Sequence, residues 1–145
     1  MKKLIGIIAI LTIIFIYGCS KQPSSIKAKQ DGKPLIVMYG DFKCPYCKKV
    51  EDKVMPKLRN KYIDKNKVKF QYVNLAFIGK DSIIGSRAQQ AVNHYAPKYS
   101  LQFQKLMFEH QKDEDKKWIT HTLIDKQIDK LNISNKTKDK IKTNY

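Results

Sequence analysis

Two cysteines, Cys44 and Cys47, stand three positions apart and enclose a proline and a tyrosine. An apolar run from Leu35 to Tyr39 leads straight into them, and an amphipathic stretch follows. Cysteines with this spacing at the first turn of a helix can close a small disulfide, and the first thiol faces free backbone N–H groups. Those donors and the positive end of the helix dipole stabilise a thiolate, the species that attacks disulfides. The pattern therefore predicts a redox site.

The residues around the pair are consistent with this chemistry. Pro45 suits the first helical position, where its missing N–H is not needed. Lys43, Lys48 and Lys49 add positive charge, which we expect to lie close to the sulfurs.

The same spacing is also half of a zinc site. Zinc would need two further ligands, but the chain has three cysteines in all and no second pair. Its histidines, His94, His110 and His121, are scattered through helical patterns without mutual ligand spacing and read as helix-face residues. We therefore expect no metal and no other cofactor, because the two sulfurs carry the electrons.

The N-terminus predicts export. Lys2 and Lys3 precede an apolar run, residues 4–17, which is shorter than the ~20 residues of a membrane-spanning helix. Residues 1–18 therefore read as a signal peptide. The Gly-Cys junction that follows resembles a bacterial lipobox, in which Cys19 would carry the lipid and become the mature N-terminus. An uncleaved anchor is the alternative. Either reading predicts a membrane-attached protein on the extracytoplasmic face, where disulfides persist.

Composition limits the remaining possibilities. Residues 19–33 are rich in Lys, Gln, Ser and Pro and read as a lipidated tether, which leaves enough chain for one domain. The formal net charge of +16 is almost entirely lysine and is spread over the polar faces. No Arg-rich cluster or phosphate loop accompanies it, so we expect no binding of nucleic acid. We also expect the protein to be a monomer.

Residues 34–80 predict a βαβ unit, the first part of an α/β fold. Residues 35–39 read as a buried strand and residues 68–77 as a second strand parallel to it. The helix between them spans residues 44–62, and Pro56 should kink or break it near Met55. One face of that helix is apolar: Val50, Val54, Leu58 and Tyr62.

Residues 81–145 predict only helices. Asp81 or Ser82 can cap the first of them, and Pro97 ends it. Ser100 and Thr120 are candidate caps for the next two, and a Lys-rich stretch from Ser134 is a candidate fourth helix. Several apolar residues repeat at helical spacing: Ile84, Ala88, Ala91, Val92, Phe103, Met107, Ile124, Ile128, Leu131 and Ile141. Trp118, Phe103 and Phe108 are expected in the core of this part.

The segment Gly40-Asp41-Phe42-Lys43-Cys44-Pro45-Tyr46-Cys47 resembles the DsbA family of thiol-disulfide oxidoreductases in the thioredoxin superfamily, in particular its lipid-anchored Gram-positive members. The resemblance implies a thioredoxin-like fold with an α-helical insertion at residues 81–145. It also implies the oxidation of cysteine pairs in secreted proteins. Cys44 would be the exposed nucleophile and Cys47 its buried partner. Pro45 and Tyr46 would tune how oxidising the disulfide is.

The chain departs from that family in two respects. Met38 occupies the position of a buried carboxylate that assists the second cysteine in several relatives. In addition, no proline follows Pro97 and no strand-like run follows Trp118, so the cis-proline loop and the C-terminal strands of the sheet are missing from the pattern. The first strand would then lack its antiparallel neighbour and expose an apolar edge.

Three functional hypotheses follow. The first is a thiol oxidase that introduces disulfides into secreted or surface proteins through Cys44 and Cys47. The second is a reductase or isomerase that uses the same site. The third is a truncated, non-catalytic lipoprotein fragment. Tyr39 and Phe42 flank the motif and could line a surface that contacts substrate peptides, although strand packing explains Tyr39 equally well.

Overall fold

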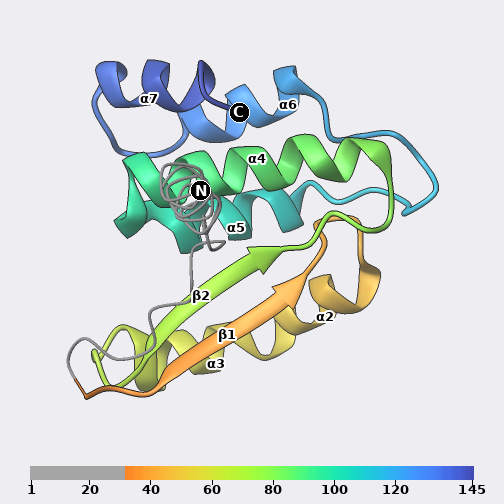
Figure 1. Cartoon of the computed structure of the whole chain (residues 1–145). Coiled ribbons are helices and arrows are strands. Elements are labelled where there is room, and N and C mark those ends of the chain that lie inside the picture. Colours follow the sequence, from red (N-terminus) through yellow and green to blue (C-terminus); the bar gives the residue numbers. More distant parts are fainter. Residues whose placement is uncertain (1–31) are drawn as a thin grey trace, which may run out of the picture.

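A computed structural model describes residues 32–145. Two parallel strands lie in the part of the chain that carries Cys44 and Cys47. Strand β1 (Leu35–Gly40) pairs with β2 (Lys69–Asn74). The register runs from Leu35 beside Lys69 to Gly40 beside Asn74. The predicted parallel βαβ unit is therefore confirmed, and both strands point toward the same end of the molecule (Figure 1).

The helical connection between the strands is broken where proline predicts a break. Helix α2 (Pro45–Lys53) ends at Val54, a short helix α3 (Met55–Leu58) follows, and a π-helix spans Arg59–Ile63. Pro56 explains the break, because a proline has no N–H and its ring clashes with the preceding helical turn.

The apolar face predicted for this connection was wrong. Val54 and Tyr62 are 52% and 45% exposed, whereas Glu51 and Met55 are buried. Glu51 accepts hydrogen bonds from Arg59 Nη2 at 2.7 Å and from Gln104 Nε2 at 2.8 Å. A partnered carboxylate therefore occupies a site that periodicity alone would assign to an apolar residue.

Strand β2 is shorter than predicted because the chain turns sharply after Asn74. Ala76 has a positive φ of 54°, a left-handed conformation that ends an extended strand. Leu75 and Phe77 are consequently 52% and 65% exposed. Strand β1, predicted to be buried, is only half-buried, with Tyr39 53% exposed.

The helices that follow β2 form a layer next to that strand (Figure 1), and this layer also contacts α2 through the hydrogen bond of Gln104 to Glu51. Helix α4 (Lys80–Tyr95) contacts β2 and ends before Pro97, as predicted. Its N-cap is Gly79 and not Asp81 or Ser82. A 3₁₀ turn (Pro97–Tyr99) leads into α5 (Ser100–Glu109), whose N-cap is Tyr99 and not Ser100.

Two further helices complete this layer. Helix α6 (His121–Asp129) begins at the predicted cap Thr120, whose Oγ1 accepts from Leu123 N at 3.1 Å. Helix α7 (Asn135–Lys142) begins at Ser134, whose Oγ accepts from Thr137 N at 3.3 Å. The cap predicted at Thr120 and the fourth helix predicted from Ser134 are confirmed.

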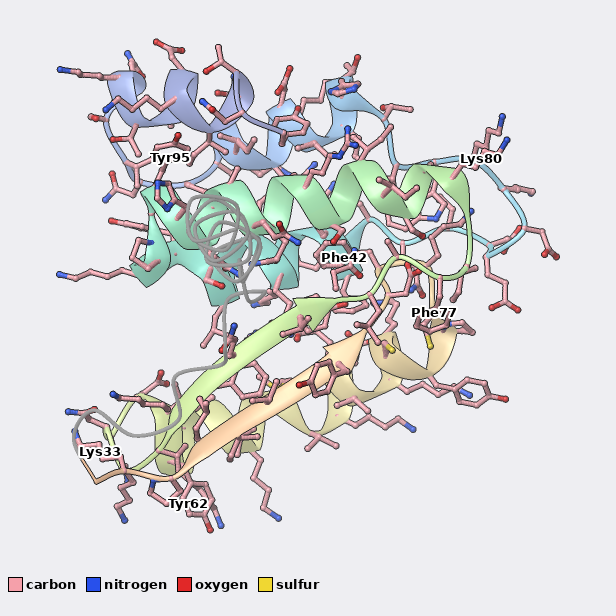
Figure 2. All side chains as sticks on the ribbon, viewed as in Figure 1. Lys33, Phe42, Tyr62, Phe77, Lys80 and Tyr95 are labelled. Atoms are coloured by element: carbon pink, nitrogen blue, oxygen red, sulfur yellow. The ribbon has the colours of Figure 1, made fainter. Side chains whose placement is uncertain are left out.

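Phe42 joins the sheet to the helical layer (Figure 2). Its ring is fully buried against the rings of Tyr72, Phe103 and Phe108. Trp118, Phe103 and Phe108 are buried, as predicted. One hydrophobic core therefore extends from the loop that carries Phe42 and Cys44 into the helices that follow β2.

Strand β1 has a second edge that no described strand pairs with. Peptide bonds are trans throughout residues 32–145. Within the same range, none of the helices combines the length and apolarity needed to cross a membrane. The predicted signal peptide (1–18), Cys19 and nearly all of the tether lie outside the described residues, and the boundary at residue 80 stays a prediction.

Candidate active site

Cys44 is the N-cap of α2. Its backbone is extended (φ −71°, ψ 117°), and its Sγ accepts a hydrogen bond from Cys47 N at 3.4 Å. Pro45 occupies the first turn, as its missing N–H predicts. Both cysteines are half-buried, and no disulfide joins them in the structure. The sulfur of Cys44 lies at the N-terminal end of the helix, the positive end of its dipole.

Cys47 lies in a less polar environment. Burial, together with the hydrogen bond between its thiol and Cys44, raises the pKa of Cys47 to about 11. A backbone hydrogen bond from Asp41 acts in the opposite direction. The Cys47 thiol is therefore neutral near pH 7, which distinguishes it chemically from a group that serves as the attacking thiolate.

Asp41 organises the loop between β1 and α2. Its fully buried carboxylate accepts three hydrogen bonds: from Lys43 N at 2.9 Å, Ser82 Oγ at 2.8 Å and Ile78 N at 3.0 Å. Its carbonyl oxygen accepts from Cys44 N at 3.0 Å. The loop is thus held from both sides, which sets the position of Cys44.

A buried ion pair ties this loop to the helical layer. Lys43 Nζ lies 2.9 Å from Asp81 Oδ1, and the two side chains are only 4% and 8% exposed. Asp81 Oδ2 accepts from Trp118 N and Ile119 N at 3.0 and 3.2 Å. Burial alone would raise the pKa of Asp81, but these partners hold it below its usual value. Lys43 was expected to add charge near the sulfurs; instead, its charge is paired with Asp81.

Gln111 also connects the loop to the helical layer. Its Nε2 donates to Phe42 O at 2.6 Å and to Cys44 O at 3.0 Å. The segment 111–118 is therefore fixed to the motif at both ends, by Gln111 and by Trp118. Between them, residues 112–117 are exposed and form one wall of an open groove of about 760 Å³; Pro45 and Lys48 form the other.

Of the other residues in and beside the motif, Tyr46, Lys48 and Lys49 lie at or near the surface, with Phe42 as the exception. Tyr46 is 72% exposed, and Lys49 Nζ lies 4.9 Å from the centre of its ring. Lys48 pairs with Asp52 at 3.0 Å. The exception is Phe42, which is fully buried, so the expectation that it contacts substrate was wrong.

Sequence reasoning missed three polar residues of this site: Asp81, Gln111 and Tyr72. Asp81 and Gln111 bond to the loop across 38 and 67–69 positions of the chain, so no local pattern signals them. Asp41 was quoted only as part of a motif. Its position directly after a strand and before a helix could have indicated a role in the turn. The described residues contain no cluster of three side chains suited to a metal ion.

Comparison with known proteins places this site in a family. A family model described as Thioredoxin matches residues 26–144. The probable disulfide bond formation protein D of Bacillus cereus is 38% identical over 96 residues, which cover 66% of this chain and 44% of the relative. Disulfide bond formation protein D of Bacillus subtilis is 36% identical over 109 residues, covering 72% and 49%. The chain thus spans about half the length of these relatives.

Solved structures agree with this result. Oxidised BdbD from Bacillus subtilis superposes with a TM-score of 0.67 at 31% identity, over 80% of this chain and 64% of that one. DsbA from Chlamydia trachomatis has a TM-score of 0.63 at 19% identity, over 78% and 62%, and supports the fold alone. The chain therefore belongs to the thioredoxin family, and in sequence and structure it is similar to disulfide bond formation proteins of Bacillus.

Proposed function

We propose that this chain is an extracytoplasmic thiol oxidase, which introduces disulfides into secreted or surface proteins through Cys44 and Cys47. The observation that carries the proposal is the placement of a free Cys44 thiol as the N-cap of α2, directly after a parallel strand. Relatives named disulfide bond formation protein support the same direction of reaction.

The reaction needs only the two sulfurs as electron carriers. A substrate thiolate attacks Cys44 Sγ in the Cys44–Cys47 disulfide, and the electron pair of the broken S–S bond goes to Cys47 Sγ. A second substrate thiolate then attacks the substrate sulfur of the mixed disulfide and expels Cys44. The substrate dithiol loses two electrons and two protons, and the cysteine pair of the protein gains them.

Cys44→Ser is expected to lower the rate of disulfide formation by at least about a hundredfold, because the mixed disulfide can no longer form. The measurement follows the oxidation of a peptide with two cysteines by the oxidised full-length chain. Cys19→Ser serves as the control and should retain the activity, since Cys19 lies outside the redox pair. Net reduction of a disulfide peptide would favour the reductase, and an intact chain that exchanges with neither peptide would be a non-catalytic fragment.

Attachment to the extracytoplasmic face of the cell membrane through lipid on Cys19 is part of the proposal. It is supported by the basic, apolar and Gly-Cys order of residues 2–19. In a Gram-positive host, labelled palmitate should enter the wild-type chain and not the Cys19→Ser variant, which should stay unprocessed or appear in the medium. Labelling that survives this substitution would disprove the anchor. The partners we propose are cysteine-containing polypeptides, acted on by a monomer.

A further inference from the structure

The buried side chain of Tyr72 lies near Cys47. Tyr72 comes from β2, where it is paired with Met38 of β1, and it is only 1% exposed. Gly40 lies close to both this ring and the thiol. A Cβ atom at Gly40 would lie 3.0 Å from Cys47 Sγ and 3.2 Å from Tyr72 Oη. The sulfur and the hydroxyl therefore border the same small space, which stays open because residue 40 has no side chain.

The hydroxyl of Tyr72 shares its acceptor, Asn74 Oδ1, with a second donor. It donates to Asn74 Oδ1 at 3.2 Å. The same oxygen also accepts from Phe42 N at 3.0 Å, so Asn74 keeps a donor when the phenol turns away. Burial raises the pKa of Tyr72 above its ordinary value, with smaller contributions from the charges of Cys47, Asp41, Cys44 and Glu51. The phenol therefore remains a proton donor near pH 7.

The reaction proposed above creates a charge on Cys47 Sγ, close to this donor, so the inference rests on that function. When a substrate thiolate opens the Cys44–Cys47 disulfide, Cys47 is the leaving group and departs as a thiolate. A half-buried thiolate is poorly solvated, and a more basic leaving thiol departs more slowly. Asp41 acts on this sulfur in two ways: a backbone hydrogen bond favours the thiolate, and the carboxylate charge makes a smaller unfavourable contribution. Tyr72 Oη and Cys47 Sγ both lie close to Gly40, so the phenol can supply an additional O–H donor.

We propose that Tyr72 is a catalytic residue, whose hydroxyl turns from Asn74 to donate a hydrogen bond to the Cys47 sulfur as it leaves. No net proton or electron passes through the phenol. The bond lowers the barrier for opening the disulfide and, in the reverse direction, stabilises the Cys47 thiolate that closes it.

The test compares Tyr72→Phe with the parent chain, both full-length and carrying Cys19→Ser. Each oxidised protein is mixed with reduced glutathione at pH 7, quenched with acid and analysed by mass spectrometry for loss of the disulfide. The rate constant for opening is expected to fall about tenfold, since a hydrogen bond to a charged group is lost. The equilibrium with glutathione at pH 7 should stay within about twofold, because Cys47 in the reduced protein is a neutral thiol at this pH.

Tyr145→Phe is the matched control. It removes a hydroxyl that donates to Asp125 at 2.6 Å, away from the motif, and should leave the rate of opening unchanged. Gly40→Ala supplies a second variant, because its Cβ would come within 3.0 Å of the sulfur and 3.2 Å of the phenol oxygen and crowd both groups. It should slow opening in the parent and have a smaller effect in the Tyr72→Phe background.

The rate and the equilibrium together decide between a catalytic and a structural role. A Tyr72→Phe rate within about twofold of the parent would overturn the inference, and so would equal losses of rate and equilibrium position. If Tyr72→Phe does not fold, the comparison in the Tyr72→Phe background is lost. In that case, an unchanged opening rate for Gly40→Ala in the parent overturns the inference. Failure of the proposed function looks different: the parent itself would then not oxidise a dithiol peptide.

Discussion

Asp81→Asn is expected to destabilise the protein by about 3–5 kcal/mol, because it leaves the buried ammonium of Lys43 without a counter-charge. The Lys43 side chain is only 4% exposed, so water cannot replace the lost carboxylate. The substitution also weakens the acceptor for Trp118 N and Ile119 N. Urea unfolding, followed by the fluorescence of Trp118, measures the loss.

Two further variants distinguish this explanation from a general effect of losing a charge. Asp113→Asn removes the exposed pair with Lys116, whose side chains are 75% and 73% exposed, and is expected to change the unfolding free energy by at most about 1 kcal/mol. Combining Asp81→Asn with Lys43→Met removes the uncompensated charge and should restore most of the stability. A loss below about 1 kcal/mol for Asp81→Asn would contradict the buried-pair explanation.

The Lys43–Asp81 pair also predicts how the unfolding free energy depends on pH. The pKa of Asp81 is lowered in the folded protein, so the stabilisation is present above the ordinary aspartate pKa of about 3.9. It is lost as the pH falls through the lower folded value, because protonated Asp81 no longer balances Lys43. The wild type and Asp81→Asn should therefore differ in unfolding free energy at neutral pH and converge below about pH 4.

Phe42→Ala is expected to lower the unfolding free energy by about 3–5 kcal/mol, the usual effect of removing a large ring from a tightly packed core. Phe42 is fully buried, and its ring centre lies 5.4 Å from that of Tyr72 and 5.3 Å from that of Phe108. Helix α4 approaches it closely at Gly85, where a Cβ would come within 3.0 Å of the ring. The cavity would therefore open where the sheet meets the helical layer.

Phe77→Ala is the matched control for this prediction. Phe77 is 65% exposed, and its loss should change the unfolding free energy by no more than about 0.5 kcal/mol. Phe42 follows β1 and Phe77 follows β2, and the two side chains differ mainly in burial. Similar urea midpoints for both variants would refute the role of Phe42 as the link between the two parts.

Local chemistry was predictable wherever neighbouring residues decide it. The two parallel strands, the break near Met55 and the helix starts at Thr120 and Ser134 follow from apolar runs, a proline and side-chain caps. Each depends on groups a few positions apart, so the pattern carries the information. The caps expected at Asp81 and Ser100 were wrong because tertiary contacts recruit those side chains: Asp81 pairs with Lys43, and Ser100 bonds to Asn93 and Gln89.

Burial was harder to predict. Helical periodicity placed Val54 and Tyr62 inside, yet both are exposed, whereas Glu51 is buried with Arg59 and Gln104. A period reports which residues share a face and does not report what that face meets. Here the face that meets α5 carries a carboxylate, which is stable inside only because partners from elsewhere in the chain neutralise and hydrogen-bond it.

The sequence by itself determined the pattern on which the proposed redox site rests, because the placement of Cys44, Pro45 and Cys47 depends only on local geometry at one strand-to-helix turn. Only the tertiary structure decided what surrounds those sulfurs. Tyr72 reaches the far side of Gly40 through strand register, and Asp81 and Gln111 reach the loop through packing of the helical layer. Contacts between residues tens of positions apart depend on how whole elements pack, and no local pattern records that.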